Sequence, residues 1–274
     1  MPNHHNQNPG RGFTLVEMLI VIAVIAILAA ILLPVFDRAK GQAENANCLS
    51  NLRQWGIAWR VYADENNDSF MTGTSVPWAR GAWILAFTNN LNSSLLLCPK
   101  AVNRRGPDTY EVPVPANDSN AVAYGGPTTV YDFPINDPTK PGASLVASYG
   151  VNCWIYNPDT NNVQGRDAAL HWRKYGNAFQ PSVTPLFADS MWRGAGPLED
   201  DPPPDLNGEW AWGSGSLNFG DMDLLAIKRH GRGINILYFD GSAQNTPVKT
   251  LWQLPWHKDW STTNETSVFP EWMN

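Results

Sequence analysis

GFTLVE at residues 12–17, followed directly by MLIVIAVIAILAAILLPVF at residues 18–36, dominates this chain of 274 residues. The second stretch has 19 consecutive residues without a charge. As a helix that rises about 1.5 Å per residue, it would cross a bilayer core of roughly 30 Å. The stretch therefore predicts a membrane helix and argues against a simple soluble cytoplasmic enzyme.

The order of the N-terminal features differs from that of a secretory signal peptide, which has a basic start, a short apolar stretch and then a small-residue cleavage site. Here the leader, residues 1–12, has one certain positive charge, Arg11, and the small residue Gly12 comes before the apolar stretch. The stretch ends in Pro-Val-Phe-Asp, without a small-residue site. We therefore predict that the helix is retained.

The hexapeptide at residues 12–17 resembles the cleavage and methylation motif of type IV prepilins and type II secretion pseudopilins. The resemblance implies that a prepilin peptidase cuts between Gly12 and Phe13 and methylates the new Phe13 amine. It also implies that Glu17 pairs with the Phe13 amine of a neighbouring subunit in a filament. Pro34 stands where pilins typically carry a proline.

Glu17 and Pro34 can also be interpreted from chemistry alone. A carboxylate near the end of an apolar helix is unfavourable in lipid unless it is paired or reaches the interface. Glu17 is therefore a candidate assembly residue, and the alternative is a carboxylate that simply meets headgroup water. Pro34 cannot donate a backbone hydrogen bond, so it predicts a kink in the helix.

An amphipathic pattern follows the apolar stretch and extends the helix. Leu52, Trp55, Trp59 and Tyr62 recur at the spacing of one helical face. The predicted organisation is a leader at 1–12, a transmembrane and filament-core helix at 13–36, an amphipathic continuation at 37–66 and a globular head at 67–274.

The acidic segment at the expected helix end has some features of a calcium loop. Asp64, Asn66 and Asp68 alternate as EF-hand ligands do, but the glycine at the sixth position and the glutamate at the twelfth are missing. Calcium is possible but unsupported, and we favour a solvated helix terminus. No other cofactor and no metal site is predicted. The net charge of −6, without clustered Lys and Arg, predicts no nucleic-acid partner.

The head reads as short strands separated by many turns, with strands expected at residues 144–151, 184–188 and 234–239. The expected fold class is α+β and pilin-like. In it, the long N-terminal helix packs on a loop-rich antiparallel β-sheet domain.

His230 and Asp240-Gly241 bracket the nine residues GRGINILYF. This H-x9-D-G segment, residues 230–241, resembles the C-terminal signature of prepilin-type proteins of Planctomycetes- and Verrucomicrobia-type bacteria. Because a six-residue strand spans about 20 Å, His230 and Asp240 need not approach one another. A role in turn and strand-end structure is favoured over catalysis or metal binding.

No active site is predicted, and an enzyme is not expected. Asp189, Ser190 and His230 supply the residue types of a hydrolase triad, but the chain has no G-x-S-x-G elbow. It also has no P-loop and no H-E-x-x-H motif.

Export to an oxidising compartment favours one disulfide among the three cysteines. Cys98 and Cys153 both lie in the head and are the predicted pair. This pairing leaves Cys48, on the helix, as the free thiol.

Together these features predict a structural pilin-like, or pseudopilin, subunit of a type II secretion or type IV pilus-like filament. Its expected partners are prepilin peptidase, other pilin or pseudopilin subunits and an inner-membrane assembly platform. We expect a single-pass protein of the bacterial inner membrane, with its leader cytoplasmic and its head periplasmic, that enters an extracytoplasmic filament.

The alternative function is that of a membrane-anchored, Trp-rich glycan-binding protein or adhesin. The chain has 13 tryptophans, whose ring faces could stack on sugars, and Trp252, Trp256 and Trp260 recur every four residues. Core packing is the favoured role, because large aromatic side chains supply most of the area that a small β-rich core buries.

Overall fold

The computed structural model describes residues 14–73, 81–87, 93–101, 125–134, 144–163, 166–204, 220–261 and 268–273. Gly12 and Phe13, the expected cleavage site, lie outside these ranges. The chain forms two compact units, an N-terminal unit of residues 1–43 and a C-terminal unit of residues 44–274.

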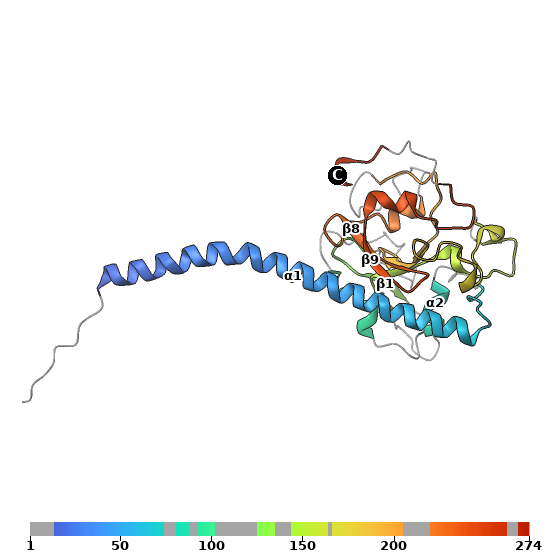
Figure 1. Ribbon diagram of the computed structural model, residues 1–274, viewed down its shortest axis with the longest axis horizontal. Coiled ribbons are helices and arrows are strands. Elements are labelled where there is room, and N and C mark those ends of the chain that lie inside the picture. Colours follow the sequence, from blue (N-terminus) through green and yellow to red (C-terminus); the bar gives the residue numbers. More distant parts are fainter. Residues whose placement is uncertain are drawn as a thin grey trace, which may run out of the picture. The chain divides into compact units, whose positions relative to one another are not determined.

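Helix α1 (Leu15–Glu65) is 51 residues long and continues through Pro34 without leaving helical structure (Figure 1). All side chains from residue 14 to residue 40 are exposed. The most apolar 18-residue window has a mean hydropathy of 3.3, and none of it is buried. Among the described residues, α1 is the one helix long and apolar enough to cross a membrane by length and composition.

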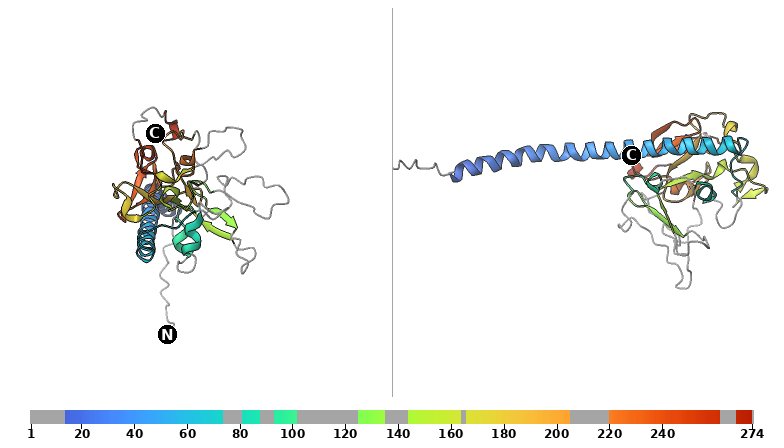
Figure 2. Two further views of the ribbon diagram at one scale, coloured as in Figure 1. Left: turned by 90° about the vertical axis from the view of Figure 1, so that its right-hand side faces the viewer. Right: turned by 90° about the horizontal axis from the view of Figure 1, so that it is seen from below.

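The second half of α1, within the C-terminal unit, is amphipathic. Its buried residues are Cys48, Leu52, Trp55, Gly56, Trp59 and Ala63. Trp55 and Trp59 both contact Phe187, and their ring centroids lie 4.9 and 6.2 Å, respectively, from the Phe187 ring centroid. The predicted apolar face is therefore confirmed, and Figure 2 shows this part of α1 lying against the strands.

Helix α1 ends at Glu65, close to the expected position. The backbone N–H of Asp68 donates to the Ala63 carbonyl at 2.8 Å, and Asp68 has a φ of 63°, so the chain turns out of the helix there. The Asp64 carboxylate pairs with Arg60 at 2.7 Å. These contacts are those of an exposed helix terminus.

The core of the C-terminal unit is a five-stranded sheet of order β7-β3-β6-β8-β9. Its strands are β3 (Tyr149–Asn152), β6 (Pro185–Asp189), β7 (Gly194–Ala195), β8 (Gly233–Tyr238) and β9 (Ala243–Pro247). Neighbouring strands are antiparallel except β3 and β7, which are parallel. The α+β, pilin-like class is confirmed, with one parallel pair that the sequence did not predict. That pair arises because the chain turns back after β6 and places β7 on the far side of β3.

Shorter elements complete the unit. Two further antiparallel pairs are β1 (Tyr131–Pro134) with β2 (Ser144–Ala147) and β4 (Asn162–Val163) with β5 (Arg166–Asp167). The short helical segments are α2 (Ala82–Phe87), η2 (Ser93–Leu96), η3 (Cys153–Ile155), η4 (Ala168–Leu170), η5 (Tyr175–Asn177), η6 (Asp221–Leu224), η7 (Val248–Gln253) and η8 (Glu271–Met273).

The strands predicted at 184–188 and 234–239 correspond to β6 and β8 within one residue at each end. The segment 144–151 instead forms two strands, β2 and β3, in different sheets. Ser148 separates them because it bonds outside both pairs. Its hydroxyl accepts the Cys98 N–H at 2.7 Å, and its carbonyl accepts the Ser190 N–H at 3.0 Å.

Tryptophan side chains supply much of the core. Eight of them are buried, namely Trp55, Trp59, Trp83, Trp154, Trp172, Trp192, Trp252 and Trp256. Trp260 and Trp272 are partly buried against the same core. The favoured packing role therefore holds for the described tryptophans, none of which is exposed.

A tight turn joins β8 to β9. Asp240 accepts the Ser242 N–H at 2.8 Å, and Gly241 has a φ of +83° with nothing within 4 Å of the position a Cβ would occupy. Backbone conformation alone therefore requires glycine here.

Replacing Gly241 with Ala is expected to lower the free energy of unfolding by about 1–2 kcal/mol, because an L-residue is strained at this φ. Gly241→Asn should cost less, since Asn tolerates positive φ best among the other residues. Urea unfolding of the full chain in detergent micelles, followed by tryptophan fluorescence, measures both. Equal stability of wild type and Gly241→Ala would contradict the assigned turn.

Candidate functional site

The first turn of α1 is a capping box. Thr14 precedes the helix, and its hydroxyl accepts the Glu17 N–H at 3.3 Å. The Glu17 carboxylate in turn accepts the Thr14 N–H at 2.8 Å and the Thr14 hydroxyl at 2.7 Å. The carboxylate proposed for assembly is thus exposed and held within its own chain by Thr14. The T-x-x-E spacing of residues 14–17 is the sequence signal that predicts such a box.

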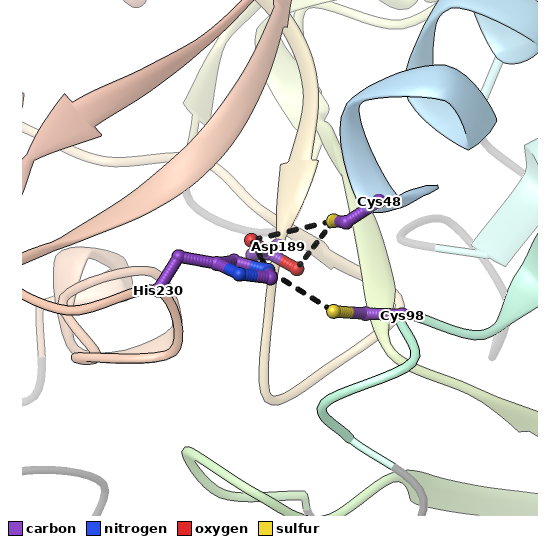
Figure 3. Close-up of side chains that lie close together, drawn as sticks. All are labelled: Cys48, Cys98, Asp189 and His230. Atoms are coloured by element: carbon purple, nitrogen blue, oxygen red, sulfur yellow. Dashed lines mark hydrogen bonds and ion pairs between the residues drawn. The ribbon is translucent and has the colours of Figure 1, made fainter. Parts of the chain in front are cut away.

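A second constellation lies inside the C-terminal unit, where four segments bring together Cys48, Cys98, Asp189 and His230 (Figure 3). We call these four residues the buried cluster. Cys48 comes from α1, Cys98 from the loop after η2, Asp189 from the end of β6 and His230 from the turn before β8. All four are buried, and one potential ligand atom of each lies within 4.8 Å of the others.

The distances in the buried cluster are those of direct contact. The Cys98 Sγ lies 3.1 Å from His230 Nε2, which is 3.4 Å from Asp189 Oδ2. The Cys48 Sγ lies 3.7 and 3.9 Å from the two Asp189 oxygens. The four side chains therefore converge on a common centre, with the histidine Nε2 facing inward.

Arg229 balances the charge of Asp189. Its guanidinium is fully buried, and NH1 lies 3.1 Å from Asp189 Oδ1. The remaining guanidinium contacts are with backbone carbonyls, those of Gly126, Pro127, Ser148 and Ser190. Asp189 Oδ2 also accepts the Asn235 N–H at 2.8 Å. The carboxylate is therefore fixed in orientation from outside the cluster.

The two thiols of the buried cluster differ in acidity. Burial by itself would raise the pKa of Cys98, but hydrogen bonds with Cys48 and His230 and the charge of Arg229 lower it to about 6. Burial raises the pKa of Cys48 well above its usual value, and the contacts with Cys98 and Asp189 raise it further. The pKa shifts of the two thiols are therefore in opposite directions.

The structure separates the parts of the H-x9-D-G segment. Strand β8 lies between them, with Asp240-Gly241 in the hairpin turn at one end and His230 in the buried cluster at the other. The expected turn structure is present for Asp240 and Gly241. His230 has the expected strand-end contact, because its N–H donates to the Gly233 carbonyl at 2.9 Å, and its side chain also contacts a thiol and a carboxylate.

The residue types of a hydrolase triad do not form one. Asp189 and His230 are adjacent, but the Ser190 hydroxyl donates to the Leu224 carbonyl at 3.1 Å and accepts the Trp192 N–H at 3.1 Å. Ser190 therefore faces away from the imidazole.

The predicted disulfide between Cys98 and Cys153 is absent from the structure. All three cysteines are described and buried, and no disulfide joins any two of them. Cys153 begins η3 and its thiol donates to the Val151 carbonyl at 4.0 Å, whereas Cys98 faces Cys48 and His230. The error has a physical cause: shared location in the head does not determine which thiols meet, and Cys48 is on the buried side of α1.

Comparison with known proteins concerns the N-terminal part of the chain. Residues 8–33 match the family model of the prokaryotic N-terminal methylation motif. The chain is 38% identical over 61 residues to the type IV major pilin protein PilA of Myxococcus xanthus, covering 22% of this chain and 28% of that protein. It is 42% identical over 57 residues to the type IV wide pilus major component PilA4 of Thermus thermophilus, covering 21% of this chain and 44% of that protein.

The matched segment thus spans less than half the length of either relative. No solved structure matches the chain at a significant level. The chain is type IV pilin-like, with a prepilin methylation motif that runs into the apolar part of α1.

Proposed function

We propose that this chain is a structural subunit of a filament, a type II secretion pseudopilus or a type IV pilus-like fibre, and that it assembles through the first half of α1. The observation that carries the proposal is a methylation motif that overlaps a helix with apolar side chains exposed on every side. Such a surface is stable in lipid before assembly, and it is buried among neighbouring helices after assembly.

Processing and location follow from this proposal. Prepilin peptidase cuts between Gly12 and Phe13 and methylates the Phe13 amine. The subunit waits in the inner membrane with its leader side cytoplasmic and its C-terminal unit periplasmic. An inner-membrane assembly platform then transfers it to the filament, where it contacts other pilin or pseudopilin subunits.

Glu17 has a defined role in the exchange from membrane to filament. Before assembly its carboxylate caps its own helix through Thr14. In the filament the Phe13 amine of a neighbouring subunit supplies a positive partner for the same carboxylate. The pair fixes the axial register between subunits more than it adds stability.

The H-x9-D-G segment supports placement among the pilin-like proteins of Planctomycetes- and Verrucomicrobia-type bacteria. It forms one structural unit in which β8 lies between the His230 contact and the Asp240-Gly241 turn. An adhesin built on exposed tryptophans is less favoured, because the described tryptophans are buried or partly buried in the core.

The mature N-terminus tests the proposal directly. Intact mass and N-terminal peptide mapping of the chain from a host with an active prepilin peptidase should find methylated Phe13 as the first residue. Gly12→Leu should leave the leader attached and prevent filament formation, whereas Gly10→Leu should be processed normally. An unmethylated chain that begins at Met1 in that host would overturn the proposal.

A further inference from the structure

We propose that Cys48, Cys98, Asp189 and His230 bind one zinc ion, which fastens α1 to the sheet of the C-terminal unit. The residues offer two sulfurs, one imidazole nitrogen and one carboxylate oxygen, and each of these is a ligand type that zinc takes in proteins. The inference goes beyond the filament proposal and does not depend on it.

The spacing of the ligand atoms fits a tetrahedral ion. With Zn–S near 2.3 Å and Zn–N or Zn–O near 2.0–2.2 Å, tetrahedral ligand atoms lie roughly 3.3–3.8 Å from one another. Asp189 Oδ2 lies 3.4 Å from His230 Nε2 and 3.9 Å from Cys48 Sγ, and Cys98 Sγ lies 3.1 Å from His230 Nε2. All four ligand atoms lie within 4.8 Å of one another. Small side-chain shifts suffice to place an ion at their centre.

The donor types and the burial select the metal and its role. Thiolate and imidazole suit zinc, whereas calcium and magnesium take oxygen ligands almost exclusively. Four protein ligands fill a tetrahedral shell, and all four residues are buried, so no position faces solvent. The site is therefore structural and offers no room for a substrate.

Charge balance also favours a bound dication. Zinc binds both sulfurs as thiolates, each of which has lost its one proton, and one Zn²⁺ with two thiolates forms a neutral zinc dithiolate. The Asp189 carboxylate is already neutralised by the buried Arg229 guanidinium at 3.1 Å. The complete site is thus neutral in a core where a net charge would be costly.

Groups outside the buried cluster hold the ligands in place. The Tyr149 hydroxyl donates to Cys48 Sγ at 3.2 Å. Arg229 and the Asn235 N–H both bind Asp189. Such outer partners orient ligands at metal sites and make them more selective.

A Cys48–Cys98 disulfide is the competing arrangement of the same residues. It would need neither the imidazole of His230 nor the carboxylate of Asp189, yet both point at the two sulfurs. The convergence of all four side chains is explained by an ion and not by a disulfide.

The test uses the full mature chain in mild detergent, purified without chelator. Metal analysis and native mass spectrometry should find one zinc per chain, with a mass gain of one zinc less two protons. Cobalt should replace it and give the sulfur-to-cobalt absorption and visible bands of a tetrahedral thiolate site. The cobalt spectrum is measured on the wild-type chain, so this test remains valid even where a substitution prevents folding.

Variants identify the ligands. Cys98→Ser and His230→Gln each remove a ligand, so the zinc content of each variant after chelator dialysis should fall by about tenfold or more. Cys153→Ser changes a buried thiol outside the cluster and should retain one ion per chain. Near-UV circular dichroism confirms folding of each variant. The proposal is overturned if reduced wild type takes up neither zinc nor cobalt. It is also overturned if Cys48 and Cys98 are isolated as a disulfide and the reduced chain then takes up no zinc. A loss of zinc from Cys153→Ser as large as that from Cys98→Ser would overturn it too.

Discussion

Glu17→Ala is expected to abolish filament assembly while cleavage and membrane insertion continue. The substitution removes the carboxylate that the neighbouring Phe13 amine would meet, and leaves that amine without a partner inside an apolar bundle. The apolar residues 18–36 are unchanged, so the subunit still enters the membrane. Shearing or secretion assays score the assembled fraction, and mass spectrometry of the membrane fraction scores cleavage.

Two controls make the Glu17 result specific. Glu65→Ala removes an exposed carboxylate at the far end of the same helix and should assemble normally. Thr14→Val removes the capping hydroxyl but keeps the carboxylate, so it should weaken the helix start without preventing assembly. Wild-type amounts of filament from Glu17→Ala would refute the assembly role and favour a membrane-anchored binding protein.

Arg229→Met is expected to lower the free energy of unfolding of the metal-free chain by about 3–5 kcal/mol, because it leaves Asp189 as an uncompensated buried charge. Both side chains are fully buried. The substitution also removes the donor that serves the carbonyls of Gly126, Pro127, Ser148 and Ser190. These contacts link the segment before β1 to the start of β3 and the end of β6.

Urea unfolding in detergent micelles measures this change. Arg232→Met, which changes an exposed arginine three residues along the chain, should shift stability by less than about 0.5 kcal/mol. Arg229→Lys should recover part of the loss, since an ammonium keeps the charge but cannot serve the same fork of acceptors. If Arg229→Met unfolded at the wild-type urea concentration, the buried ion pair would not have the structural role described.

Local patterns in the sequence were sufficient for most of the fold. The apolar stretch at 18–36 and the spacing of Leu52, Trp55 and Trp59 predict α1, because helix periodicity repeats within a few residues. The compact run at 234–239 predicts β8 for a similar reason. The parallel β3–β7 pair was not predicted, because it depends on how the chain turns after β6 and not on any local spacing.

The buried cluster could not be predicted in the same way. Cys48 and Asp189 are 141 positions apart, and Cys98 and His230 are 132 apart, so no short motif joins them. Metal motifs are recognised from ligands a few residues apart, and here each of the four segments contributes one ligand. Local spacing therefore predicts only a strand-end role for His230, and shared location in the head predicts the pair of Cys98 and Cys153.

The late positions of β6 and β8 in the chain set the order in which α1 can be covered. Trp55 and Trp59 on α1 pack on Phe187 of β6, and Leu237 of β8 lies against Gly56. Phe70, Trp83 and Phe87 follow α1 closely in the chain and also pack on Trp55 and Trp59. The aromatic side of α1 can therefore be covered in part as soon as α2 is made, and its covering is complete only when β6 and β8 have followed.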